Sequence, residues 1–325
     1  MKRVWTAVSL NQKAFAGLTL VIILFPVFVK SNFILTIAIF IALYGMNSIA
    51  AGLTMGYAGQ LLLAFPFFFG IGAYTSAILT TAYHVNPWLA LVIGVIFAGS
   101  TAYIIGLPIV KLGFLYMGMV TFGIIIIAQI FMGELAITGG HVGLWEIPPL
   151  SIATWAFDSV IKNYYLVWAM TLAIAALTLN IVNSRTGRAL KAIATNELAA
   201  SAMGINIEKY KNQAHVIQAI YCAVAGSLYT NFVGFVDPTG FGLSFSLTVL
   251  MMMCVGGMFS VWGMLLGAFL VTILTEILHT VTPLLFSSAA TSQFEMIFYG
   301  IGLIVVIIYM PAGLMGWLSK LSMRL

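Results

Sequence analysis

Residues 88–109 read WLALVIGVIFAGSTAYIIGLPI, a run of 22 residues without a single charged side chain. An α-helix needs about 20 apolar residues to cross the ~30 Å hydrocarbon core of a bilayer. The run therefore has the length and composition of a membrane-spanning helix. Its apolar residues are continuous rather than alternating, which favours a helix over a strand of a membrane β-barrel.

Runs of this kind recur through the whole chain. Hydrophobic residues make up 62% of the 325 and charged residues 6%, whereas soluble domains are about one quarter charged. No Pro-, Gly- or Ser-rich linker divides the sequence, so residues 1–325 are predicted to form one transmembrane domain. We predict an all-α polytopic membrane protein with about ten transmembrane helices, near residues 14–30, 33–53, 64–83, 88–109, 114–134, 164–183, 212–234, 244–261, 263–281 and 294–311.

The basic residues set the predicted orientation. With the N-terminus on the cytoplasmic side, 11 of the 13 Lys and Arg residues fall in cytoplasmic segments, and only Lys30 and Lys162 fall outside. Because cytoplasmic loops are enriched in Lys and Arg, both termini are predicted to be cytoplasmic. The net charge of +5 then reflects topology, and no nucleic-acid partner is expected.

The N-terminus has one feature of a signal peptide. Lys2, Arg3 and Lys13 precede an apolar run, but no small-residue cleavage site follows it. We therefore expect an uncleaved first span. Cys222 and Cys254 both lie within apolar runs and are expected to be packing residues.

Two segments between spans are long enough to carry a function: an external one at about 135–163 and a cytoplasmic one at about 184–211. The cytoplasmic segment holds five of the 13 basic residues and is rich in Ala, Leu, Lys and Glu. It is predicted to be helical, with Ser184 or Thr186 as N-cap and Gly204 at its end.

The sequence lacks the motifs of several enzyme classes. It has no Gly-Lys dipeptide, hence no nucleotide-binding P-loop, and no HExxH, CxxC or GxSxG motif. The four His residues are scattered, so no metal site is expected. We predict that the chain is not an enzyme and holds no cofactor.

Polar side chains inside the predicted spans are few. Asn47, Gln60 and Gln129 are among them, whereas the acidic residues fall at span ends, where a charge costs little. No series of buried acids suggests a proton relay. The residues alone leave three classes open: a permease subunit, a self-contained secondary amino-acid or amide transporter or channel, and a membrane enzyme acting on lipids.

Several stretches carry a more specific signal. They are GYAGQ at 56–60 with FGIGAY at 69–74, TGG at 138–140 with GL at 143–144, GRALKAI at 187–193 with NELAA at 196–200, GGM at 256–258 with WG at 262–263, and PAGL at 311–314. Together, over roughly residues 45–316, they resemble the LivM-type permeases (the LivH/LivM family). These are membrane subunits of ATP-binding-cassette importers for branched-chain amino acids.

The resemblance implies a multi-pass permease in the bacterial inner (plasma) membrane that forms the translocation pathway as a heterodimer with a homologous permease subunit. Two cytoplasmic ABC ATPases would bind and hydrolyse the ATP, and a periplasmic or other extracytoplasmic binding protein would deliver the amino acid. The residues that the resemblance implies in coupling to the ATPases are Arg185, Gly187, Arg188, Lys191, Asn196, Glu197 and Gly204.

Two further groups of residues are expected to act in transport. Those expected at the translocation pathway are Asn47, Gly56, Gly59, Gln60 and Gln129, and those expected to dock or gate the binding protein are Gly139, Gly140 and Gly143. Plain helix packing, an ordinary turn, and basic residues that only set topology or contact lipid are the open alternatives.

The chain also departs from the family pattern. It has Leu-Leu-Ala-Phe-Pro at 62–66 where the family usually has Ser-Leu-Gly-His, and no Arg near Thr195. These differences leave the substrate open between branched-chain amino acids, other amino acids and urea-type amides.

Overall fold

The structure is a computed structural model that describes residues 15, 17–152, 155–285, 300–302, 304, 308 and 313–316. Helices dominate it. In chain order they are Gly17–Phe28, α2 (Asn32–Ala51), the π-helix η1 (Gly52–Tyr57), α3 (Phe65–Thr81), α4 (Pro87–Ile109), α5 (Phe114–Glu134), α6 (Val160–Asn183), α7 (Arg185–Thr195), α8 (Glu197–Ala202), α9 (Ile207–Val233), α10 (Leu243–Gly256) and α11 (Val261–Leu285). Three 3₁₀ turns and two short strands are η2 (Ala136–Thr138), η3 (Gly140–Val142), β1 (Ser151–Ile152), β2 (Trp155–Ala156) and η4 (Thr239–Phe241).

Six segments of the described chain are long and apolar enough to cross a membrane: Asn32–Tyr57, Pro87–Ile109, Phe114–Glu134, Val160–Asn183, Ile207–Val233 and Val261–Thr280. Shorter apolar helices cover Gly17–Phe28, Phe65–Thr81 and Leu243–Gly256. These positions match nine predicted spans, and the predicted span at 294–311 lies almost wholly outside the described residues. The helical, multi-pass architecture is confirmed, whereas the count of ten crossings stays a prediction.

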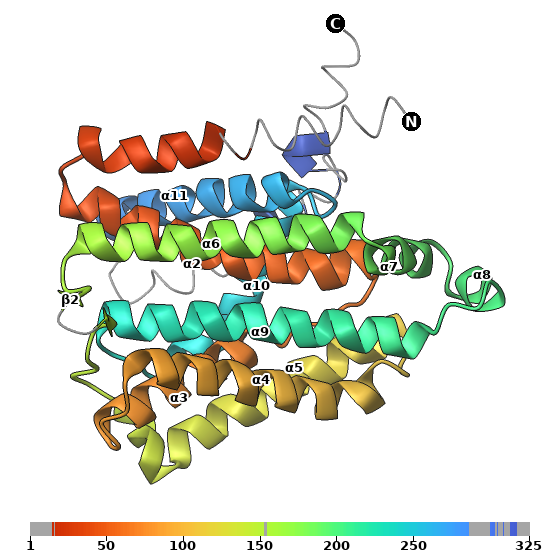
Figure 1. Cartoon of the computed structure of the whole chain (residues 1–325), viewed down its shortest axis with the longest axis horizontal. Helices are drawn as coiled ribbons and strands as arrows, with labels where there is room; N and C mark the ends of the chain where they lie inside the picture. The colour runs from red at the N-terminus through yellow and green to blue at the C-terminus, as the bar shows by residue number, and fades with distance from the viewer. Residues whose placement is uncertain are drawn as a thin grey trace, which may run out of the picture.

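Helix α9 runs through the middle of the bundle and packs against α2, α3 and α4 (Figure 1). In lipid, helices associate mainly through close packing of small residues. Two glycines allow this close packing between α3 and α9. A Cβ at Gly72 would lie 2.1 Å from the Ala223 carbonyl oxygen, and one at Gly226 would lie 2.0 Å from the Phe69 carbonyl oxygen. The two backbones are therefore in direct contact.

Helix α4 also packs closely through small residues, along one whole face. Its buried small residues are spaced four apart, at Ala90, Gly94, Ala98, Ala102 and Gly106. Positions four apart share one side of a helix. The opposite side of α4 is apolar and exposed, which suits contact with lipid or with another membrane subunit.

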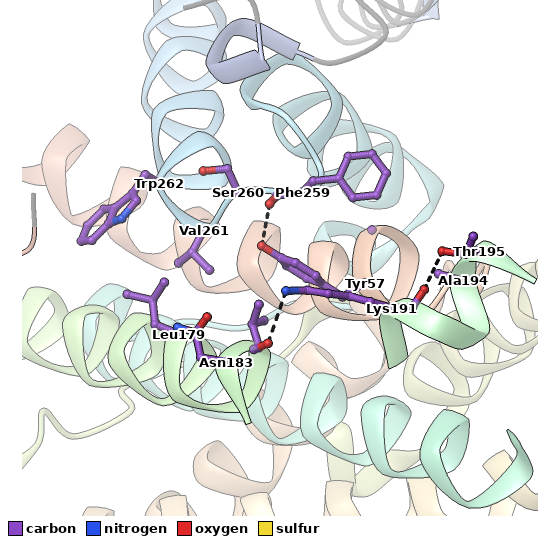
Figure 2. A pocket seen from close by; sticks show the side chains of 12 residues that line it. Tyr57, Leu179, Asn183, Lys191, Ala194, Thr195, Phe259, Ser260, Val261 and Trp262 are labelled. Carbon is purple, nitrogen blue, oxygen red and sulfur yellow. Dashed lines mark hydrogen bonds between the residues drawn. The ribbon is translucent and has the colours of Figure 1, made fainter. Parts of the chain in front are cut away.

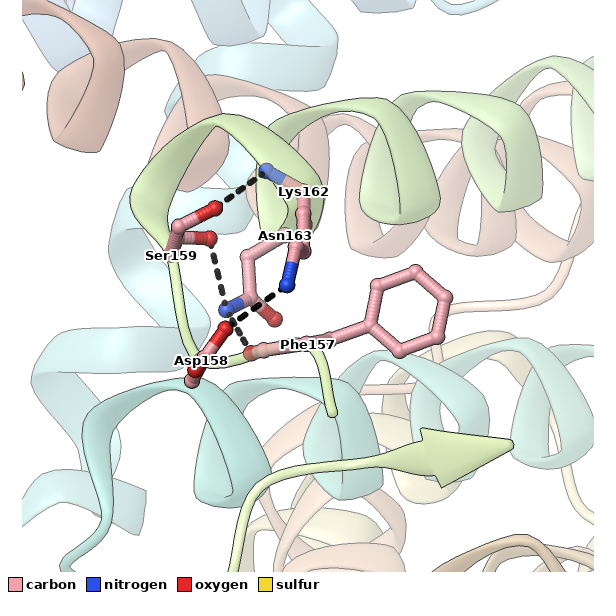
Figure 3. A network of polar contacts seen from close by, with 5 residues as sticks. All are labelled: Phe157, Asp158, Ser159, Lys162 and Asn163. Carbon is pink, nitrogen blue, oxygen red and sulfur yellow. Dashed lines mark hydrogen bonds and ion pairs between the residues drawn. The ribbon is translucent and has the colours of Figure 1, made fainter. Parts of the chain in front are cut away.

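Helix α6 begins at a network of polar contacts (Figure 3). Ser159 is its N-cap and accepts a hydrogen bond from the Lys162 N–H at 3.3 Å. The Asn163 amide donates to the Phe157 carbonyl at 2.6 Å. The hydrogen bond from the Lys162 ammonium, 2.9 Å long, lowers the pKa of the Asp158 carboxyl. The start of α6 is thereby tied to the segment before it.

The basic residues of the described chain divide unevenly between the two ends of the bundle. Lys30 and Lys162 lie at the end where α6 begins. The others lie at the end where α6 passes into α7, which we call the α7 end: Lys111, Arg185, Arg188, Lys191, Lys209 and Lys211. Their clustering agrees with the predicted cytoplasmic side, but the orientation itself stays a prediction.

Candidate functional site

Residues 58–64, between η1 and α3, are not helical although they lie inside the bundle. Gln60 is fully buried. The Leu63 N–H donates to the Thr121 hydroxyl of α5 at 3.1 Å, and the Ser246 hydroxyl of α10 donates to the Leu63 carbonyl at 2.6 Å. Irregular backbone at membrane depth is tolerated only where it is buried in protein or lines a cavity. The helices around this segment meet that condition by supplying hydrogen-bond partners.

The π-helix η1 precedes this segment and lies directly on the turn between α10 and α11. A Cβ at Gly56 would lie 1.9 Å from the Met258 carbonyl oxygen, so only glycine fits there. The Tyr57 hydroxyl donates to the Phe259 carbonyl at 2.6 Å. Single π-turns within helices occur frequently at functional sites. Here the π-turn ends with Tyr57 bonded to a residue 202 positions away in the sequence.

Helices α7 and α8 form the predicted cytoplasmic segment, and α8 projects from the bundle (Figure 1). Gly187 permits the tight turn from α6, since a Cβ there would lie 2.3 Å from the Val182 carbonyl oxygen. Asn196 is the N-cap of α8 and accepts from the Ala199 N–H at 3.0 Å. Gly204 follows α8 with φ of 79°, a conformation that favours glycine.

The structure of this segment differs from the sequence prediction in one detail. The segment is two helices rather than one, because the extended backbone of Asn196 ends α7 and its side chain starts α8. Ser184, not Thr186, is the N-cap of α7, accepting from the Gly187 N–H at 3.4 Å. Gly187, Asn196 and Gly204 thus give the helix pair its shape.

The Lys191 ammonium points back toward the transmembrane helices. It donates to the Val182 carbonyl at 3.3 Å and lies 5.4 Å from the centroid of the Tyr57 ring. The last carbonyls of a helix lack intrahelical partners, and an aromatic face attracts a cation. Burial lowers the pKa of the Lys191 ammonium.

A cavity of about 590 Å³ lies beside this contact (Figure 2). Its walls come from η1, α6, α7, the turn between α10 and α11 and the start of α11. They include Tyr57, Asn183, Lys191, Thr195, Ser260 and Trp262. Figure 2 labels Lys191 and Tyr57 among the side chains that line it, and the Lys191 ammonium lies 5.4 Å from the centroid of the Tyr57 ring. The cavity leaves unfilled space where α7 meets the transmembrane helices.

The outer surface of the helix pair combines charge with exposed apolar side chains. Arg185 and Arg188 are exposed. Leu198 is 84% exposed and Met203 is 83% exposed, at the projecting tip. Exposed apolar patches with a polar rim are typical of protein-interaction sites, and these two side chains are candidates for such a contact. The exposure of Leu198 and Met203 was not predicted from the sequence, although two large apolar residues in an otherwise polar or small segment were a signal for it.

Glu197 attaches α8 to α9 through an ion pair. Its carboxylate accepts a hydrogen bond from the Lys211 ammonium at 2.5 Å, and the Lys211 side chain is only 4% exposed. We expect Glu197→Ala to destabilise the α8 region by about 2 kcal/mol, because a buried cation loses its partner. Hydrogen exchange of the amides at 199–205 would then speed up by roughly 30-fold.

The matched control for this prediction is Glu208→Ala. Glu208 pairs with Lys111 at 3.8 Å, and both side chains are more than half exposed. Such a pair contributes about 0–1 kcal/mol, so exchange at 199–205 should change little. Equal effects of Glu197→Ala and Glu208→Ala would contradict the bracing role of Glu197.

The structure brings some predicted pathway residues together and separates others. Gly56 lies in η1, and Gly59 and Gln60 lie in the irregular segment that follows it. A Cβ at Gly59 would lie 3.1 Å from Cα of Ala194 in α7. Asn47 is buried on α2, before η1 in the chain, where its amide donates to the Leu43 carbonyl at 2.9 Å.

Gln129 lies apart from this group. It is half-buried on α5 and packs against Gly242 at the start of α10. Eight residues, or about 12 Å of helix rise, separate it from Thr121, the α5 residue that holds the irregular segment.

The external-segment glycines fold their loop onto the connection between α9 and α10. Gly139, Gly140 and Gly143 all have positive φ. A Cβ at Gly143 would lie 2.1 Å from the Val236 carbonyl oxygen, and Leu144 and Val236 exchange backbone hydrogen bonds of 2.9 and 3.0 Å. These contacts explain the glycines by turn geometry and leave Val142 and Trp145 exposed.

A bundle of apolar, membrane-length helices with a basic helix pair at one end is the architecture of a multi-pass membrane protein. Residues 33–307 match the family model described as branched-chain amino acid transport system / permease component. This chain is 26% identical to the high-affinity branched-chain amino acid transport system permease protein LivM of Escherichia coli, over 94% of this chain and 76% of that protein. It is 27% identical to the corresponding LivH of Salmonella typhimurium, over 82% and 90%.

The chain belongs to this family of permease components, as its resemblance to the LivH/LivM family predicted. It is a multi-pass protein of the cell membrane, and its family is one of transport permeases. Among solved structures, a chain of PsaBC from Streptococcus pneumoniae in complex with Fab aligns over 85% of this chain and 91% of its own length. With 13% identity and a TM-score of 0.46, that likeness carries no argument.

Proposed function

We propose that this chain is one permease subunit of an ATP-driven importer for branched-chain or related amino acids. It forms the translocation pathway with a homologous permease subunit. Two separate ATPases bind and hydrolyse the ATP, and an extracytoplasmic binding protein delivers the substrate. The names of the relatives support the substrate class.

The observation that carries this proposal is the projecting helix pair. Helices α7 and α8 present Arg185, Arg188, Leu198 and Met203 outward. Interface anchors are typically large side chains that insert into pockets of the partner, with charged groups at the rim guiding association. The inner side of the pair contacts η1 and α6. A partner bound to this surface is thus in a position to act on the transmembrane helices.

The distribution of the basic residues supports the proposed orientation. With the α7 end in the cytoplasm, six of the eight basic residues in the described chain lie on the side where Lys and Arg are enriched. The ATPases, which are cytoplasmic, then meet the helix pair directly. The opposite end, with exposed Val142 and Trp145, faces the binding protein.

Gln60 is proposed to contact the substrate as it passes. It is fully buried, and in the described part of the chain no protein atom pairs with either polar atom of its side-chain amide. A buried polar group without a partner costs roughly 1–3 kcal/mol. Gln60→Met should therefore keep or raise the unfolding midpoint in detergent while lowering uptake about tenfold.

Asn163→Leu provides the contrast to Gln60→Met. The Asn163 amide donates to two backbone carbonyls at the start of α6, so its loss should lower the midpoint. Unchanged uptake in Gln60→Met would remove Gln60 from the pathway.

The first experiment is purification of the tagged full-length chain from native membranes in mild detergent, with its partners identified by mass spectrometry. Recovery of a second permease and P-loop ATPases, together with uptake by the reconstituted complex that requires ATP, is the expected result. The alternative, a self-contained secondary transporter or channel, predicts that the chain is recovered alone after crosslinking. It also predicts uptake that follows an ion gradient and is insensitive to ATP.

A further inference from the structure

We propose that Lys191 is a positioning residue that transmits movement of α7 through Tyr57 to the turn between α10 and α11, and is not itself a contact to the ATPase. This proposal rests on the proposed function, because a bound partner must move α7. It replaces the role that the family resemblance implied for Lys191.

The Lys191 side chain connects α7 to two other elements. Arg185, Arg188 and Lys191 are all partly exposed to solvent, and Arg188 donates to the Asn183 carbonyl at 3.4 Å. Lys191 differs in that its ammonium is 3.3 Å from the Val182 carbonyl and also 5.4 Å from the centroid of the Tyr57 ring of η1. One of the three donors of the Lys191 ammonium is used on the Val182 carbonyl, and its charge lies near the Tyr57 ring. The side chain thereby attaches α7 to the end of α6 and to η1.

The second step is the contact between η1 and the turn. Tyr57 receives the ammonium on its ring and donates its hydroxyl to the Phe259 carbonyl at 2.6 Å. The Gly56 backbone lies against the Met258 carbonyl. One side chain therefore contacts both α7 and the turn, and the backbone beside it allows no gap.

The third step is the rigidity of the two helices that the turn joins. A Cβ at Gly256 would lie 1.9 Å from the Gly263 carbonyl oxygen, and one at Gly267 would lie 1.8 Å from the Met252 carbonyl oxygen. Helices α10 and α11 thus touch through their backbones. Packed elements of this kind move as units rather than deform continuously, so displacement of the turn moves both helices.

The last step leads to the buried irregular segment. Ser246 of α10 donates its hydroxyl to the Leu63 carbonyl at 2.6 Å. Movement of α10 therefore reaches residues 58–64, which contain Gln60. The cavity of about 590 Å³ beside Lys191 supplies the space in which α7 can shift.

The first test uses the full-length chain alone. Lys191→Met removes the ammonium and keeps a side chain of similar shape, and Tyr57→Phe removes the hydroxyl and keeps the ring. Both should speed hydrogen exchange at 257–264, about 2- to 30-fold for a coupling of 0.5–2 kcal/mol. Lys209→Met, on the exposed first turn of α9, should not. If hydrogen exchange at 257–264 were unchanged in Lys191→Met, the proposed linkage would be wrong.

The second test uses the assembled transporter. Lys191→Met should bind ATPase as the wild type does, yet hydrolyse about 2- to 30-fold more ATP per substrate transported. In the double variant with Tyr57→Phe, the ATP hydrolysed per substrate should rise by less than the product of the two single-variant increases, because both residues act on one linkage. A purely structural role would lower the amount of complex without changing this ratio.

The outcomes separate the two proposals. If Lys191→Met loses ATPase and keeps the ratio, Lys191 is a docking contact and the positioning role is wrong. If the wild-type chain recovers no ATPase at all, the proposed function fails, and the exchange measurement still decides whether Lys191 is linked to the turn.

Discussion

The double variant Leu198→Asp, Met203→Asp is expected to insert into the membrane normally and to lose its ATPase partners, with the recovered ATPase falling about 100-fold or more. Both side chains are more than four-fifths exposed at the tip of the helix pair. Truncating a large anchor of an interface typically costs about 2 kcal/mol or more, and a carboxylate in its place would have to be buried without a partner. The free chain loses little, since neither side chain packs in it.

The control for this variant is Val142→Asp, Trp145→Asp. It introduces the same two charges on exposed apolar positions, 70% and 59% exposed, at the opposite end of the bundle. ATPase recovery by co-purification should match the wild type there. Recovery of ATPase with both double variants would show that α8 is not the docking tip. Loss only with the control would reverse the proposed orientation.

The helices of this chain could be predicted from the sequence because the lipid solvent imposes a simple rule. An uncharged run of about 20 residues has to be a helix in order to satisfy its own backbone. Residues 88–109 and 114–134 follow this rule, and the structure places α4 and α5 at almost the same positions.

The π-helix η1 and the burial of the irregular segment were beyond the same reasoning. The predicted spans at 33–53 and 64–83 leave a break between them, but its position inside the bundle depends on backbone partners that lie 58 and 183 residues from Leu63, at Thr121 and Ser246. Hydropathy along the sequence contains no record of such distant pairings.

The candidate coupling residues divide in the same way. The resemblance picked out Gly187, Asn196 and Gly204, and local geometry explains each by a turn or a cap. Whether a lysine faces outward or inward depends on tertiary contacts. The inward direction of Lys191 follows from the position of Tyr57, which the spacing of the two residues in the sequence does not reveal.

Gly56→Ala is the second change with a large expected effect. The added Cβ would lie 1.9 Å from the Met258 carbonyl oxygen and 2.8 Å from its carbonyl carbon, and backbone atoms cannot rotate away as a side chain can. Overpacking of this kind costs about 3 kcal/mol at the upper end of its usual range. We expect a lower unfolding midpoint in detergent and, in the protein that does fold, loss of most uptake, because η1 is pushed away from the turn.

Gly123→Ala is the control that separates this clash from a general effect of replacing glycine. Gly123 is helical too, on α5, and a Cβ there would meet nothing within 4 Å. Alanine favours a helix over glycine by up to about 1 kcal/mol, so this variant should be as stable as the wild type or more so, with normal uptake. If Gly56→Ala matched Gly123→Ala in unfolding midpoint and uptake, the backbone of η1 would not be in close contact with the turn. The proposed linkage from α7 to α10 and α11 would then fail at that contact.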